Sequence, residues 1–155
     1  MTRRNGLDLA DTAHFDPPET GGTNGNERLE VTVVFTGDGT TLSALKTADA
    51  LATRLGARIT LIALEVVPYP AALNTPPVVL EFARNRLRTV ARLSAVDADL
   101  RVYLCRDRWD ALTVVLKPRS LVVLGARKRW WPTAESRLSK RLRRAGYEVV
   151  MAETE

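Results

Sequence analysis

From position 29 onward, short apolar runs rich in β-branched residues alternate with longer amphipathic segments. Runs of the first kind predict strands, and apolar positions that recur every three to four residues predict helices. The predicted strands are Leu29–Phe35, Ala57–Val67, Ala98–Cys105, Ser120–Gly125 and Tyr147–Ala152. The predicted helices span about 41–55, 77–94, 107–117 and 133–145.

Residues with known preferences for helix ends mark the boundaries of these segments. Thr40 or Thr41 can accept hydrogen bonds from the first free amides of the first helix, and Asp107 can do so for the third. Gly56 and Gly146 end the first and last helices, as a glycine after the last turn commonly does. The second helix is predicted to face inward with Phe82, Leu87 and Val90, and the last with Leu138, Leu142 and Ala145.

The regular alternation of strands and helices predicts an α/β fold. It favours a three-layer α/β/α sandwich, in which a five-stranded parallel sheet is doubly wound in a Rossmann-like manner. Ligands of such folds bind outside the carboxyl ends of the strands, near the point where the strand order reverses. The candidate binding segments are therefore Thr36–Thr41, after the first strand, and Gly125–Pro132, after the fourth.

Length and composition indicate one folded domain in the 155-residue chain. Residues 1–28 are polar, without apolar periodicity, and are expected to be a disordered tail before a domain at 29–155. The single Cys105 excludes an internal disulfide, and with only one histidine, His14, no Cys/His metal site is expected. The apolar runs are too short to cross a membrane, and the expected compartment is the cytoplasm.

The net charge of +5 is unevenly distributed along the chain. Between Arg84 and Arg144 there are 17 Lys/Arg and 5 Asp/Glu, a net of +12, and the remainder carries −7. A field of this size attracts nucleotides, nucleic acid or an acidic partner surface. The alternative is a solvated, arginine-rich surface that serves solubility alone.

Several segments resemble the universal stress protein family. The strand Val33-Val34-Phe35 followed by Thr36-Gly37, and then Ala44-Leu45, is similar to the family's opening strand, turn and first helix. The segment from Asp107 to Leu112 resembles the start of its third helix, and Ser120–Gly125 the strand before its phosphate loop. The resemblance implies a dimeric regulatory protein of the stress response with a nucleotide site. It covers residues 29–152.

In nucleotide-binding members of that family, the phosphate loop reads Gly, two residues, Gly, nine residues, then Gly-Ser or Gly-Thr. Here Gly125 keeps the first glycine, Lys128 replaces the second, and Glu135-Ser136 stands where Gly-Ser would be. The resemblance implies a site for ATP, another nucleotide or an anion, with weak, altered or absent binding. The candidate residues are Thr36, Gly37, Asp38, Gly125, Arg127, Lys128, Arg129, Thr133 and Ser136.

The loop that replaces the glycines has a chemistry of its own. Cations at 127–129 can neutralise phosphate, Trp130 and Trp131 can stack on a base, and Thr133 opens a helix whose amides favour anions. The alternative is structural, with both indoles capping the sheet and the cations facing water.

The sequence shows no recognisable arrangement of catalytic residues. It contains no phosphate-loop lysine motif and no histidine in the folded region, so a non-enzymatic regulatory module is expected. The runner-up is a nucleic-acid-binding protein that uses the basic surface. The last strand, with Tyr147, Val149 and Met151, is the candidate homodimer seam, because an apolar edge strand would otherwise be unprotected.

Overall fold

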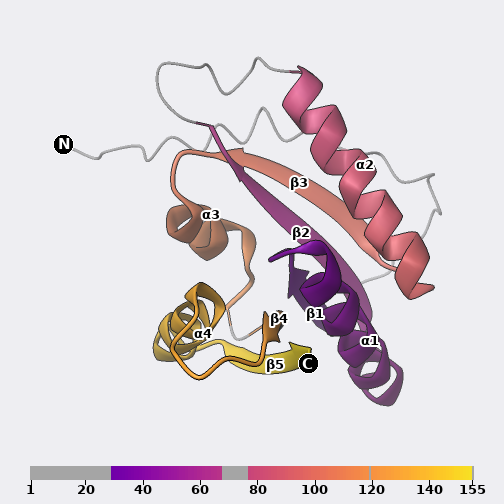
Figure 1. Ribbon diagram of the computed structural model, residues 1–155. Helices are drawn as coiled ribbons and strands as arrows, with labels where there is room; N and C mark the ends of the chain where they lie inside the picture. Colours follow the sequence, from indigo (N-terminus) through magenta and orange to yellow (C-terminus); the bar gives the residue numbers. More distant parts are fainter. Residues whose placement is uncertain (1–28, 68–76, 119, 155) are drawn as a thin grey trace.

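The computed structural model describes residues 29–67, 77–118 and 120–154 (Figure 1). The tail predicted at 1–28 lies outside the described residues, as does the proline-rich connection at 68–76. Among the residues described, no helix is long and apolar enough to cross a membrane.

Five parallel strands form one sheet in the order β3-β2-β1-β4-β5, as the alternating pattern predicted. Their bounds are β1 (Glu30–Val34), β2 (Arg58–Val66), β3 (Asp99–Cys105), β4 (Leu121–Arg127) and β5 (Glu148–Thr154). In the central strand, Val33 pairs with Leu61 of β2 on one side and with Val123 of β4 on the other. The strand order therefore reverses between β1 and β4, which is where doubly wound sheets bind ligands.

Two helices pack on each face of the sheet, which gives the predicted three layers (Figure 1). The helices are α1 (Asp38–Leu55), α2 (Pro77–Ser94), α3 (Arg108–Val115) and α4 (Ala134–Arg144). One apolar cluster joins the sheet to α1 and α2 through residues such as Leu45 and Leu87. The other joins it to α3 and α4 through residues such as Leu112 and Leu142. Both faces of the central strands are buried, which explains their continuous apolar runs.

The predicted cap of α3 is confirmed, and α4 has a cap of the same kind. The Asp107 carboxylate accepts from the amide of Asp110 at 2.9 Å, and the Thr133 hydroxyl accepts from the amide of Ser136 at 3.2 Å. Gly56 ends α1 with a φ of 64°, a left-handed conformation that costs glycine little.

The prediction that Thr40 or Thr41 caps the first helix is wrong, because α1 begins earlier, at Asp38, with Gly37 as its N-cap residue. The Thr41 hydroxyl faces back out of the helix and accepts from the amide of Thr36 at 3.1 Å. It therefore fixes the approach to the helix rather than its first turn.

Two predicted inward positions are also wrong. Phe82 is 68% exposed, because the inward face of α2 follows Ala83, Leu87 and Val90, and Phe82 precedes that row by one residue. Ala145 is exposed because it is the C-cap of α4 and lies beyond its last turn.

The fourth strand continues beyond the predicted end at Gly125. It runs to Arg127, which pairs with Thr154, because β5 extends alongside it over the same length. The connecting loop is consequently shorter than the predicted 126–132.

Candidate functional site

A hollow of about 480 Å³ lies at the carboxyl ends of β1 and β4, where the amino ends of α1 and α4 meet. This is the edge of the sheet that the strand order singles out as a ligand site. Its lining is Thr36, Gly37, Asp38, Gly39, Thr40, Arg127, Arg129, Trp131, Pro132, Thr133, Ala134 and Glu135.

The structure brings most of the predicted site residues together. Six of the nine line the hollow; they are Thr36, Gly37, Asp38, Arg127, Arg129 and Thr133. They come from two segments that are far apart in the sequence and adjacent in space only because β1 and β4 are neighbours. The other three, Gly125, Lys128 and Ser136, lie outside the lining, each for a separate reason.

Gly125 holds two elements close together. A Cβ atom at this position would overlap the backbone of Thr40 in the first turn of α1. The Gly125 carbonyl oxygen accepts from the Thr36 hydroxyl at 2.9 Å. The glycine therefore allows α1 to sit directly on β4, and in this structure its backbone contacts Thr40 rather than the hollow.

Lys128 and Ser136 are held by local hydrogen bonds. The Lys128 amide donates to the Thr154 carbonyl oxygen at 3.1 Å and so extends the pairing of β4 with β5, while its side chain is exposed. The Ser136 amide donates to the Thr133 hydroxyl at 3.2 Å, and the Ser136 hydroxyl donates to the Thr133 carbonyl at 3.0 Å. Ser136 thus completes the cap of α4.

Three threonines stiffen the β1 side of the hollow. The hydroxyls of Thr36 and Thr40 lie 2.9 Å apart, and Thr40 also lies within hydrogen-bond distance of the Gly37 carbonyl oxygen at 3.2 Å. The Thr41 hydroxyl accepts from the Thr36 amide. Because the Thr36 hydroxyl donates across to β4, this network connects both strands that carry the hollow.

Arg86, which the sequence reasoning missed, modifies the charge of the hollow from outside. It projects from α2, and its Nε donates to Oδ1 of Asp38 at 2.8 Å. Its guanidinium also lies 5.0 Å from the ring centroid of Phe35. Arg86 therefore compensates Asp38, one of the two carboxylates of the lining; the other, Glu135, shares the hollow with Arg127 and Arg129.

The two adjacent indoles do not cap the sheet. Trp130 is completely exposed and lies outside the lining, whereas Trp131 is 68% exposed and contributes to the rim of the hollow. The structural alternative for these residues is therefore wrong, and both rings are available to other molecules.

The side chains of the candidate dimer seam are part of the core. Val149 is buried, and Tyr147 and Met151 pack in the same cluster as Leu142 of α4. These side chains point to the face of the sheet that α4 covers. The outer edge of β5 is formed by its backbone N–H and C=O groups. In the described chain β5 is an edge strand, so pairing of two copies there stays a prediction.

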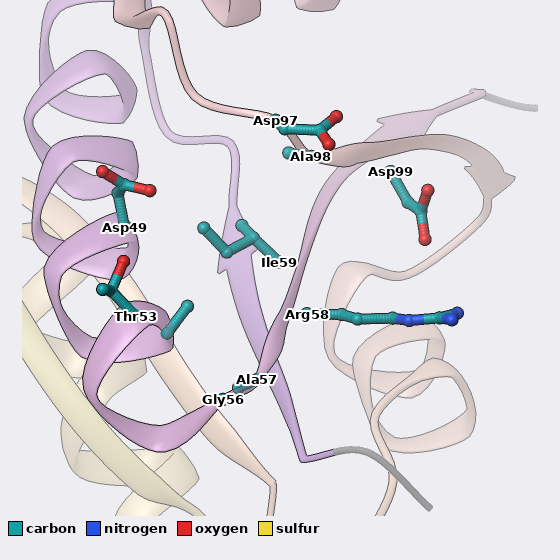
Figure 2. A pocket seen from close by; sticks show the side chains of 10 residues that line it. Asp49, Thr53, Gly56, Ala57, Arg58, Ile59, Asp97, Ala98 and Asp99 are labelled. Atoms are coloured by element: carbon teal, nitrogen blue, oxygen red, sulfur yellow. The ribbon is translucent and has the colours of Figure 1, made fainter. Parts of the chain in front are cut away.

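A second hollow, of about 550 Å³, lies at the opposite end of the sheet, near the starts of β2 and β3. Figure 2 shows Asp49 and Thr53 projecting from α1, whereas Arg58 and Asp99 extend away from that helix. The described residues contain no group of three or more His, Cys, Asp or Glu that could hold a metal ion. The lining carboxylates, Asp49, Asp97 and Asp99, are spread around this hollow instead of converging.

Comparisons based on sequence give no match. No protein-family model matches the chain, and no curated protein is similar enough in sequence to match it.

Several solved structures share its fold. A universal stress protein from Archaeoglobus fulgidus matches with a TM-score of 0.56 and 14% identity, over 79% of this chain and 92% of the other. A universal stress protein in complex with cAMP matches with a TM-score of 0.51 and 17% identity, over 82% and 98%. The Archaeoglobus fulgidus protein in complex with dAMP matches with a TM-score of 0.52 and 14% identity, over 80% and 96%. The chain therefore has the fold of the universal stress proteins.

Proposed function

We propose that this protein is a non-enzymatic regulatory module that binds an adenine nucleotide, preferably a monophosphate, in the hollow between α1 and α4. The observation that carries the proposal is the position of Arg127 and Arg129 beside the amino end of α4, at the strand-order reversal. Two proteins of the same fold are described with cAMP and dAMP, which supports this class of ligand.

The amino end of α4 offers donors to a phosphate group. Ala134 and Glu135 line the hollow, and no acceptor in the described chain pairs with their amides. The next amide, that of Ser136, is already bound by Thr133. Two free amides, the helix dipole and two guanidinium groups favour one phosphate at this point.

The remaining lining suits a base and a sugar. Trp131 presents an exposed ring at the rim, on which a purine can stack. On the other side, the backbone of Gly37 and Gly39 and the Thr36 hydroxyl provide small polar surfaces. The carboxylate of Glu135 repels additional phosphates, so a monophosphate is expected to bind more tightly than ATP.

The proposed lack of catalysis rests on the chemistry of the lining. Among the described residues that form it, the side chains offer hydroxyl, carboxylate, guanidinium and indole groups, without an imidazole or thiol. Cys105 is buried at the end of β3, and burial raises the pKa of its thiol and keeps it protonated. We further propose a cytoplasmic protein that dimerises through the edge of β5 and reports nucleotide binding to a partner.

Isothermal titration with AMP, cAMP and ATP tests the nucleotide site. The variant Arg127→Ser/Arg129→Ser is expected to lose AMP affinity by at least about tenfold, because two charge-assisted donors are removed. Lys128→Ser is the matched control, since this cation lies between the two arginines in sequence but outside the lining. Absence of AMP binding to the unaltered protein, or an equal loss in the control, would contradict the proposal.

A further inference from the structure

The stretch from Arg127 to Arg144 concentrates positive charge. It contains eight Lys/Arg and one acidic residue, Glu135. Structurally it is the end of β4, the loop that follows it, and α4. The arginines at 127 and 129 line the hollow, so the remaining cations need a separate account.

Three cations form an exposed stripe along the outer face of α4. Arg137, Lys140 and Arg144 are exposed, on the side of the helix opposite the buried Ser139 and Leu142. No described carboxylate lies within ion-pair distance of any of the three. The stripe spans about 10 Å at 1.5 Å per residue.

The other two cations of α4 serve the fold. The Arg141 guanidinium lies 4.1 Å from the ring centroid of Trp109 in α3. Arg143 donates to the Val149 carbonyl oxygen of β5 at 2.9 Å. Two cations of α4 therefore make contacts within the protein, and the other three are exposed to solvent.

The loop that directly precedes α4 carries an exposed aromatic ring and an exposed cation. Trp130 is completely exposed, and the exposed side chain of Lys128 precedes it by two residues. Burying an indole is normally favourable, so two adjacent exposed indoles, Trp130 and Trp131, indicate a surface that another molecule covers.

We propose that Lys128, Trp130, Arg137, Lys140 and Arg144 form a binding surface for single-stranded nucleic acid. The cations neutralise successive phosphates, and Trp130 stacks on an unpaired base. A duplex is less suitable because its bases are already stacked on one another. A lipid surface is also less suitable, because the five residues include one indole and no aliphatic side chain that could enter a bilayer.

This surface differs from the basic residues of α2. There Arg84 pairs with Glu81 at 3.3 Å and Arg86 pairs with Asp38 at 2.8 Å. In addition, α2 covers the opposite face of the sheet (Figure 1). The two halves of the basic region therefore cannot follow one strand, and two of the arginines of α2 are already paired with carboxylates.

Fluorescence anisotropy with labelled 20-nucleotide dT and rU oligomers tests the surface. The triple variant Arg137→Ser/Lys140→Ser/Arg144→Ser is expected to reduce the slope of log affinity against log salt by about 2, for three lost phosphate contacts. Its control is Lys46→Ser/Arg54→Ser/Arg92→Ser, which removes three exposed cations from α1 and α2. An equal loss of affinity in both variants would overturn the proposal, because it would show that binding depends on the net charge of the protein and not on the position of these cations.

A second pair of variants tests the stacking step. Trp130→Ala is expected to weaken oligomer binding about fivefold to 100-fold, and Trp130→Phe to restore most of it. Neither is expected to change AMP affinity, because Trp130 does not line the hollow. Binding to phosphatidylglycerol vesicles but not to either oligomer would overturn the proposal and assign the surface to a membrane.

Discussion

The backbone of Thr40 occupies the space that a side chain at Gly125 would need. This contact sets how closely α1 approaches β4, and therefore the position of the helix end that forms one wall of the hollow. Since Thr36 also donates to the Gly125 carbonyl oxygen, the junction between β1, α1 and β4 depends on one glycine.

Substitution of Gly125 tests this packing. Gly125→Ala is expected to destabilise the protein by about 1–3 kcal/mol, because the added methyl group forces α1 away from the sheet. Gly39→Ala is the control, because nothing lies within 4 Å of its added Cβ and alanine favours helix. Urea unfolding of both variants is the measurement, and equal stabilities would show that the contact is not limiting.

The pair formed by Arg86 and Asp38 is expected to affect ligand binding more than stability. Both side chains are substantially exposed, so the pair contributes at most about 1 kcal/mol to folding. Arg86→Ala leaves Asp38 uncompensated beside the hollow, and the affinity for AMP is expected to fall. Asp38→Asn in the Arg86→Ala background is expected to restore it. Titration of the two variants with AMP decides this, and a failure of the second substitution to restore binding would separate Arg86 from the site.

Glu30 makes stability depend on pH. Burial acts to raise the pKa of its carboxyl group, but the hydrogen bond from Thr60 and the ammonium of Lys117 together lower the pKa below its usual 4.5. The distances are 2.6 Å to the Thr60 hydroxyl and 3.1 Å to Lys117 Nζ. A lowered pKa in the folded state stabilises the protein above pH 4.5, and this contribution is lost as the pH falls through the folded-state pKa.

The variant Glu30→Gln checks this contribution. It is expected to be less stable than the unaltered protein near pH 7 by about 1 kcal/mol, because a charged hydrogen-bond acceptor is lost. The difference is expected to shrink as the pH falls below 4.5. Thermal unfolding of both proteins between pH 3 and pH 7 is the measurement, and a constant difference would contradict the assignment.

A charge at Val149 is expected to unfold the chain instead of separating two folded subunits. Val149 is buried with Leu142 against α4, so Val149→Asp places an unpaired carboxylate in the core and costs roughly 3 kcal/mol or more. Glu153→Lys is the control at an exposed position of the same strand. Circular dichroism reports whether the variant is folded and light scattering reports its subunit number, and a folded monomeric Val149→Asp variant would place this side chain in a subunit interface.

The fold was predictable because its information is local. Each strand is an apolar run, and the predicted cap Asp107 acts on an amide only three residues away. Parallel order and the site at the ends of β1 and β4 then follow from general rules of connection. The same reasoning placed Arg127 and Arg129 correctly beside Thr36.

The features that sequence reasoning missed depend on contacts between distant segments. Gly125 reads as a phosphate-loop glycine, and only the position of Thr40 shows that it serves the packing of α1. Arg86 belongs to a regular helical stretch of arginines, and nothing in that spacing indicates that it reaches Asp38. The exposure of Phe82 was missed for a similar reason. The periodic pattern locates the buried face of a helix only to within about one residue, and contacts with the sheet decide which residues it contains.

Thr154 joins three parts of the molecule through its backbone and its side chain. Its carbonyl oxygen accepts from the Lys128 amide at the base of the loop, and its hydroxyl donates to Ser43 of α1 at 2.8 Å. The end of β5 is therefore hydrogen-bonded both to α1 and to the segment that follows β4. If the proposed nucleotide binds between these segments, a force that displaces β5 would lower its affinity, and the bound nucleotide would equally oppose that displacement.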